Sequence, residues 1–146
     1  MNNATHSYYL TKIDPTPTEI RAEQVQSLVR DVFHLDDDVD LTRIDSYAAI
    51  DRSANEVVAV VNYHTLLHKL VDVCVDEKHR RRGLARRLLE FAIGDVKKNR
   101  PEQYSVTIDV DEGNVGAFDL YRGLGFKPLL KCNWKHTMYV VLNGGE

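Results

Sequence analysis

The sequence predicts an α/β fold in which a mixed, mainly antiparallel sheet is flanked by helices, within a single domain spanning residues 1–146. The length of 146 residues and the 43% apolar content suit one hydrophobic core. Strand-like and helix-like segments alternate along the chain. Short polar connections separate the strand-like segments in the middle and at the C-terminal end, as is typical of antiparallel neighbours.

The N-terminal part predicts one strand followed by one helix. Residues 7–13 alternate weakly and form the expected first strand, which the Asp-Pro-Thr-Pro run at 14–17 ends. Thr18 is placed to cap the helix that follows. Residues 35–40 then break the helical pattern with four carboxylates. The apolar residues that recur near helical spacing are Ile20, Val25, Leu28, Val29, Val32 and Phe33.

The middle of the chain predicts three strands that are sequential neighbours, followed by the clearest helix. Residues 47–50 and 57–63 are strand-like, and the polar segment 51–55 between them reads as a hairpin loop. Residues 71–75 form the third strand of this group. Residues 84–99 form an amphipathic helix, and Pro101 lies just past its end.

The C-terminal part predicts a strand, a helix and two final antiparallel strands. Residues 104–110 alternate as a strand, and 111–114 turn the chain into the helix. This helix carries Val115, Phe118, Tyr121 and Leu124, and Gly125 is its expected C-terminal stop. Residues 126–130 and 134–142 are the final strands.

Charge and cysteine content narrow the class of protein. The 19 basic and 22 acidic side chains give a net charge of −3, so no overall field draws the molecule to nucleic acid. Two cysteines are too few for a disulfide scaffold, which favours a reduced, cytoplasmic location. Neither a signal-peptide pattern nor an apolar run of membrane-spanning length is present, so no membrane partner is expected.

A basic turn at residues 79–87, His-Arg-Arg-Arg-Gly-Leu-Ala-Arg-Arg, joins an apolar strand to the clearest helix. Such a turn presents free backbone N–H groups, the positive end of the helix dipole and arginines to one anionic group. The glycine spacing matches neither the nucleotide-hydrolysing loop nor the dinucleotide turn. A solvated basic face or a nucleic-acid patch is the alternative interpretation.

Two sequence blocks carry a resemblance to a known family. Residues 80–85, Arg-Arg-Arg-Gly-Leu-Ala, match the pattern Q/R-x-x-G-x-G/A, with Ala85 in a position often held by glycine. Residues 114–126 match N-x-x-A-x-x-L-Y-x-x-x-G-F at the expected distance downstream. On these blocks, which lie between about residues 71 and 126, the chain resembles the GCN5-related N-acetyltransferase (GNAT) family.

The resemblance implies acetyl-CoA as the donor and transfer to an amine nitrogen without a covalent enzyme intermediate. Backbone N–H groups of the basic turn would hold the pyrophosphate, which explains the small residues Gly83 and Ala85. Residues 73–75 would offer backbone groups to the pantetheine arm, and Asn114 would contact its amides. The implied cofactor-binding residues are Val73, Cys74, Val75, Arg80, Arg81, Arg82, Gly83, Leu84, Ala85, Arg86, Asn114, Ala117 and Tyr121.

The reaction requires an acid, a base and an oxyanion donor. A primary amine, with a pKa of about 10.4, must lose a proton before it attacks, and the departing thiolate, with a pKa of about 8.5 for its thiol, gains from a proton donor. The resemblance places Tyr121 near the sulfur as the general acid, and a backbone N–H of residues 73–75 is the candidate oxyanion donor. The base remains open between Asp72, Asp109, His68 and a water relay.

An acidic segment suggests the acceptor. Asp36, Asp37 and Asp38 follow the first helix, and in this fold that connection borders the acceptor site. Carboxylates there favour cationic acceptors such as polyamines. A protein N-terminal or lysine acetyltransferase and a non-catalytic acetyl-CoA-binding module are the alternatives.

The sequence gives weaker pointers to metals, thiol chemistry and assembly. His64 and His68 have i, i+4 spacing but no H-E-x-x-H pattern, so no metal is expected. Cys74 reads as a buried structural thiol rather than a nucleophile. In similar proteins the final strands often pair between subunits, which makes a homodimer a partner to test.

Overall fold

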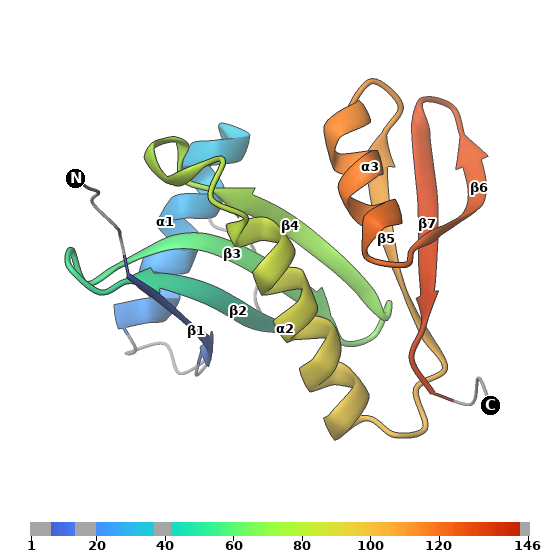
Figure 1. Ribbon diagram of the computed structural model, residues 1–146, viewed down its shortest axis with the longest axis horizontal. Coiled ribbons are helices and arrows are strands. Elements are labelled where there is room, and N and C mark those ends of the chain that lie inside the picture. The colour runs from blue at the N-terminus through green and yellow to red at the C-terminus, as the bar shows by residue number, and fades with distance from the viewer. Residues whose placement is uncertain (1–6, 14–19, 37–41, 144–146) are drawn as a thin grey trace.

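The strands form one seven-stranded sheet in the order β1-β2-β3-β4-β5-β7-β6 (Figure 1). This computed structural model describes residues 7–13, 20–36 and 42–143. The strands are β1 (Tyr8–Ile13), β2 (Ile44–Asp51), β3 (Glu56–His64), β4 (Lys69–Val75), β5 (Ser105–Asp111), β6 (Lys127–Cys132) and β7 (Lys135–Val141). The helices are α1 (Ile20–Phe33), α2 (Leu84–Asn99) and α3 (Val115–Gly123), with a short 3-10 turn η1 (Glu77–His79).

Every strand pair in this sheet is antiparallel except β4 with β5. The parallel pairing of β4 and β5 involves only Lys69 with Thr107 and Leu70 with Ile108. Beyond these residues the two strands diverge, and β5, β7 and β6 form a separate wing of the sheet (Figure 1). The prediction of a mixed, mainly antiparallel sheet is confirmed.

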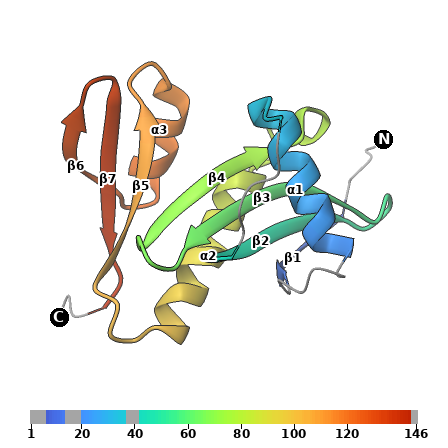
Figure 2. The ribbon, with the colours of Figure 1, turned by 180° about the vertical axis from the view of Figure 1, so that it is seen from behind.

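Helices cover both faces of the sheet. Helices α2 and α3 lie on one face, and α1 lies on the other (Figures 1 and 2). The larger hydrophobic cluster packs the buried side of α2, including Leu88, Leu89 and Ala92, against β2, β3 and β5. The smaller cluster packs Val25 and Val29 of α1 against β2, β3 and β4. No described helix is both long and apolar enough to cross a membrane.

The predicted elements agree with the structure to within a few residues. The helix over residues 84–99 has the predicted bounds, and β2 begins at Ile44, three residues before the predicted start. The turn η1 was not predicted; the carboxylate of Asp76 begins it by accepting a hydrogen bond from the backbone N–H of Lys78. The predicted cap Thr18 lies outside the described residues.

A β-bulge interrupts β4 at Asp72. The register pairs Val60 with Cys74 but Asn62 with Val71, so two residues of β4 lie opposite one residue of β3. Asp72 has a φ of 56°, in the left-handed region that aspartate tolerates better than β-branched residues. The bulge changes the side-chain alternation at the point where β4 leaves β5.

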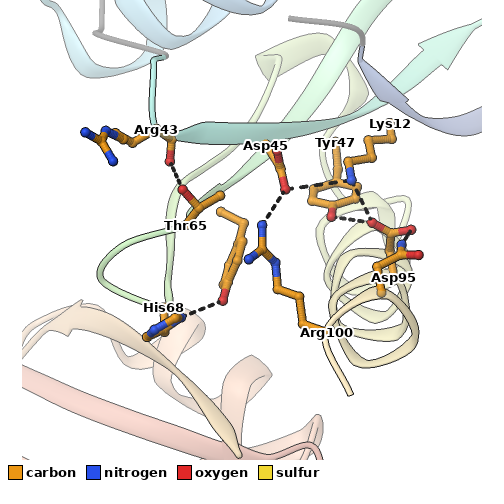
Figure 3. Close-up of polar contacts among 10 residues, drawn as sticks. Lys12, Arg43, Asp45, Tyr47, Thr65, His68, Asp95 and Arg100 are labelled. Carbon is orange, nitrogen blue, oxygen red and sulfur yellow. Dashed lines mark hydrogen bonds and ion pairs between the residues drawn. The ribbon is translucent and has the colours of Figure 1, made fainter. Parts of the chain in front are cut away.

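A polar cluster fixes the C-terminal half of α2 to β1 and β2 (Figure 3). The hydroxyl of Tyr47 donates a 2.6 Å hydrogen bond to Asp95. Lys12 lies 3.3 Å from Asp95 and 3.7 Å from Asp45, and Arg100 lies 3.5 Å from Asp45. Because this cluster fixes the C-terminal half of α2 to the sheet, it also helps to fix the position of the other end of the helix, at Gly83.

Replacing Tyr47 with phenylalanine tests this cluster. Burial alone raises the pKa of Asp95, but hydrogen bonds from Tyr47, Lys12 and Asn99 outweigh it and lower the pKa below its ordinary value. Loss of one hydrogen bond to this carboxylate should reduce the free energy of unfolding by about 1–2 kcal/mol in urea at pH 7. The effect should be complete above about pH 4, the ordinary pKa of an aspartate, and should shrink as the pH falls from there through the lowered pKa of Asp95 in the folded protein.

The control for this prediction is Tyr104→Phe, whose parent side chain is 60% exposed. Tyr104→Phe should unfold at the parent's urea concentration. Equal midpoints for Tyr47→Phe and Tyr104→Phe would show that the cluster does not stabilise the fold.

Candidate active site

The divergence of β4 from β5 opens a cavity of about 650 Å³, which we name the donor groove. Its walls come from β4, from the segment that joins β4 to α2, and from α3. The lining residues are Val32, Val73, Cys74, Val75, His79, Arg80, Arg81, Gly83, Leu84, Ala85, Arg86, Asn114, Gly116, Ala117, Leu120 and Tyr121. Every residue predicted to bind the cofactor lines this groove except Arg82, which is exposed elsewhere on the loop.

Gly83, in the basic turn, is the N-cap residue of α2. Its φ of 73° lies in the left-handed region, which glycine adopts without strain. A Cβ at this position would meet no atom within 4 Å, so the space beside the backbone is open. Glycine provides no capping side chain, and the N–H groups of the first turn of α2 are thus available to an anion.

The arginines of the turn take different positions. Arg80 donates from Nε to the backbone oxygen of Val75 at 3.1 Å, which fixes its stem beside the end of β4. Arg86 lies 3.8 Å from Glu90 and reaches the backbone oxygen of Gly123 at 3.5 Å, at the end of α3. Backbone N–H groups and guanidinium groups together make this end of the groove suitable for a pyrophosphate.

A second cavity, of about 240 Å³, also borders Tyr121, and we name it the acceptor cavity. It shares Val73, Asn114, Ala117 and Tyr121 with the donor groove, so the two spaces meet at these residues. Its remaining lining residues are Phe33, Leu70, Val71, Asp72, Ile108, Asp109, Val110, Asp111 and Lys135. A donor and an acceptor bound in these two spaces would meet beside Tyr121.

Tyr121 is held at this junction by α3. Its side chain is 6% exposed, and its ring packs 6.0 Å from that of Phe126. Burial raises the pKa of Tyr121 to about 12, so the phenol is protonated at neutral pH. Asn114 begins α3, because its side-chain oxygen accepts a 3.1 Å hydrogen bond from the backbone N–H of Ala117.

The two candidate carboxylate bases both line the acceptor cavity but have different partners. Asp109 accepts hydrogen bonds from Nζ of Lys69 at 2.8 Å and from the hydroxyl of Thr137 at 2.7 Å. Burial alone raises the pKa of Asp109, but these two hydrogen bonds and the lysine charge outweigh it and lower the pKa. Asp72 accepts a 3.0 Å hydrogen bond from the neutral amide of Asn62. The charged partner therefore makes Asp109 a weaker proton acceptor than an ordinary aspartate.

Other predicted site residues lie away from the two cavities or outside the described residues. His68 is exposed, and its Nδ1 lies 3.2 Å from the Tyr63 hydroxyl (Figure 3). Asp36 is exposed and lines neither cavity. Asp37 and Asp38 lie outside the described residues.

The thiol and metal predictions fall on described residues. Cys74 is 5% exposed, and burial raises the pKa of its thiol to about 12, as expected of a structural cysteine. Within the described ranges no three His, Cys, Asp or Glu side chains are grouped to hold a metal ion.

Two residues that line the acceptor cavity, Asp111 and Lys135, were not predicted from the sequence. The alternation of β5 could have indicated Asp111, because Asp109 and Asp111 are two residues apart and share one face of a strand. Nothing local indicated Lys135 or the partners of Asp109, since Lys69 and Thr137 lie 40 and 28 residues away in the sequence.

Comparison with solved structures shows the same fold. The ribosomal-protein-S18-alanine N-acetyltransferase of Escherichia coli is 17% identical, with a TM-score of 0.73 over 96% of this chain and 97% of that one. Arabidopsis thaliana NAA60 in complex with a bisubstrate analogue is 20% identical, with a TM-score of 0.73 over 95% and 100%. Spermidine N-acetyltransferase from Vibrio cholerae, in complex with CoA and spermine, is 13% identical, with a TM-score of 0.65 over 92% and 95%.

Comparison of the sequence gives the family. No curated protein sequence matches the chain significantly. The family model described as "Acetyltransferase (GNAT) family" matches residues 11–126, which include the β4, α2 and α3 walls of the donor groove and the β4, β5 and α3 walls of the acceptor cavity. The chain therefore belongs to the GNAT family and is an acetyl-CoA-dependent N-acetyltransferase.

Proposed function

We propose that this enzyme acetylates a primary amine of a small cation with several charges, such as a polyamine. The acceptor cavity carries the proposal, because three carboxylates, Asp72, Asp109 and Asp111, line about 240 Å³ beside Tyr121. Lys135 is the one basic residue among the described lining residues, so carboxylates predominate. An acidic cavity attracts ammonium groups and disfavours acidic acceptors.

The donor groove fits acetyl-CoA, which supplies an activated acetyl group as a thioester. The N–H groups after Gly83, with Arg80, Arg81 and Arg86, would hold the pyrophosphate. The edge of β4 at residues 73–75, left unpaired by β5, would bind the pantetheine amides and offer an N–H to the developing oxyanion.

Asp72 is proposed as the base that takes the proton from the ammonium group. Its hydrogen-bond donor is the neutral amide of Asn62, whereas Asp109 is held by the charged Lys69. A carboxylate paired with a lysine loses most of its tendency to accept a proton. Asp109 would instead attract and orient the cation.

Tyr121 is proposed to donate a hydrogen bond to the departing sulfur. The pKa of about 12 keeps its proton in place at neutral pH. Full transfer to a thiolate whose thiol has a pKa of about 8.5 would be uphill by about 5 kcal/mol. The phenol therefore stabilises the thiolate by hydrogen bonding rather than by giving up its proton.

One comparison supports this proposal, and a further cavity favours one competitor. The Vibrio cholerae enzyme, whose structure holds CoA and spermine, has the same fold. A peptide amine is the second candidate, because a further cavity of about 250 Å³ beside the β6–β7 turn shares Lys135 with the acceptor cavity and would receive a longer acceptor. This further cavity is lined by Cys132, Asn133, Trp134, Lys135 and Thr137.

A competition assay separates the two acceptor classes. The enzyme with acetyl-CoA receives spermidine and a short peptide with free α- and ε-amines at equal concentrations, and mass spectrometry follows both products. Spermidine should be acetylated at least about tenfold faster, because its charges match the carboxylates of the cavity. Preferential acetylation of the peptide would favour the second candidate and reject the polyamine proposal.

The Gly83→Asp variant tests the donor groove. An aspartate would place a negative charge where the pyrophosphate is expected, on a residue whose φ favours glycine. Affinity for acetyl-CoA, measured by calorimetry, should fall at least about 100-fold.

The matched control is Gly94→Asp, which adds the same charge in the middle of α2, also in open space. This variant should bind acetyl-CoA with nearly the parent's affinity. Normal affinity in a folded Gly83→Asp variant would reject the assignment of the pyrophosphate site.

The Asp72→Asn and Asp109→Asn variants test the assignment of the base. Loss of the base should lower kcat about 100-fold or more in Asp72→Asn, with acetyl-CoA affinity retained. Asp109→Asn should chiefly raise KM for the amine. The reverse pattern, with the larger loss of kcat in Asp109→Asn, would exchange the two roles.

A further inference from the structure

A buried amide lies directly behind the proposed base. Asn62 sits in β3 with no exposed surface, and its Nδ2 donates a 3.0 Å hydrogen bond to Oδ2 of Asp72. Its Oδ1 has no hydrogen-bond partner within the described part of the chain. The neighbours Val60, Val61 and Tyr63 on the same strand are fully buried as well.

Folding alone gives little reason for an amide at this position. A buried polar atom without a partner costs about 1–3 kcal/mol, whereas an apolar side chain of the same size carries no such cost. Asn62 gains one hydrogen bond, to Asp72, and Asp72 itself is partly accessible from the acceptor cavity. The amide therefore serves the carboxylate of Asp72 rather than the stability of the fold.

Asp72 needs a partner that holds it without cancelling its charge. It occupies the bulge of β4 with a φ of 56°, where the strand no longer fixes its direction by regular alternation. A lysine partner would suppress proton uptake, as Lys69 does at Asp109. A neutral N–H donor fixes the carboxylate and leaves it able to accept a proton.

We propose that Asn62 is the positioning residue of the proposed base, holding Asp72 as a carboxylate directed into the acceptor cavity. The inference rests on the proposed role of Asp72 in the function described above. The ionisable groups that face Asp72 are Asp109 and Asp111 from β5, Lys135 from β7, Tyr121 from α3 and Cys74 on its own strand. Phe33, the contribution of α1 to the cavity, carries no charge.

The Asn62→Leu variant tests this proposal, with Asn62→Val as a second variant in case leucine disturbs the strand. The carboxyl resonance of Asp72 is followed by ¹³C NMR at pH 7 in the free enzyme, and its signal is assigned by its loss in Asp72→Asn. Removal of the donor should shift this resonance, because the hydrogen bond to Oδ2 is lost. The value of kcat should fall at least about tenfold, with little change in KM for the amine, because the proposed base is no longer held in place.

Two comparisons show whether the effect is specific. Asn99→Leu removes a matched amide, which donates to Asp95 at 2.8 Å on the exposed side of α2, and should leave both the Asp72 resonance and kcat unchanged. In an Asp72→Asn background, Asn62→Leu should cause no further loss of kcat. Unfolding in urea should show Asn62→Leu to be at least as stable as the parent.

The outcomes separate this inference from the proposed function. An unchanged Asp72 resonance or an unchanged kcat in folded Asn62→Leu and Asn62→Val would overturn the role of Asn62 whatever the acceptor is. A shifted resonance with full activity of Asp72→Asn would retain the contact but overturn Asp72 as the base, and with it the positioning role. A shifted resonance and a lowered kcat in Asn62→Leu, together with loss of activity in Asp72→Asn, support both.

Discussion

The short parallel pairing between β4 and β5 is the constraint on which the rest of the site depends. Only Lys69 and Leu70 pair with β5, and the remainder of β4 diverges from it. Full pairing would use the backbone groups of residues 73–75 within the sheet and bring α2 and α3 together. The divergence leaves that edge of β4 free and gives both cavities a shared boundary at Tyr121.

The charges divide between the two sides of this boundary. The start of α2 gathers the N–H groups after Gly83 and the nearby arginines on the donor side, while the acceptor side presents the carboxylates of β4 and β5. Under the proposed function, this division would draw the anionic donor and the cationic acceptor to different spaces. The hydrogen-bond donors then distinguish the carboxylates, because the charged Lys69 holds Asp109 whereas a neutral amide holds Asp72.

Local pattern predicted most of the fold and the donor side of the site. Helical spacing gave the bounds of α2, and the glycine spacing of the basic turn located the loop that lines the groove. The acceptor side depends on contacts between distant segments, so it was less predictable. No local signal shows that Asp72 lies in a bulge with a left-handed φ, or that Asn62 supports it from the next strand. Asp36, from the acidic segment that suggested a cationic acceptor, lines neither cavity. Asp111, from another part of the chain, does line the acceptor cavity.

The most direct test of the account is a crystal structure of the enzyme with a conjugate that joins coenzyme A to spermidine. The pantetheine arm should lie along residues 73–75, the pyrophosphate at the N–H groups after Gly83, and the linked amine nitrogen within hydrogen-bond reach of Asp72, directly or through one water. A conjugate whose polyamine chain leaves the acceptor cavity empty, with its nitrogen remote from Asp72 and Asp109, would contradict the account.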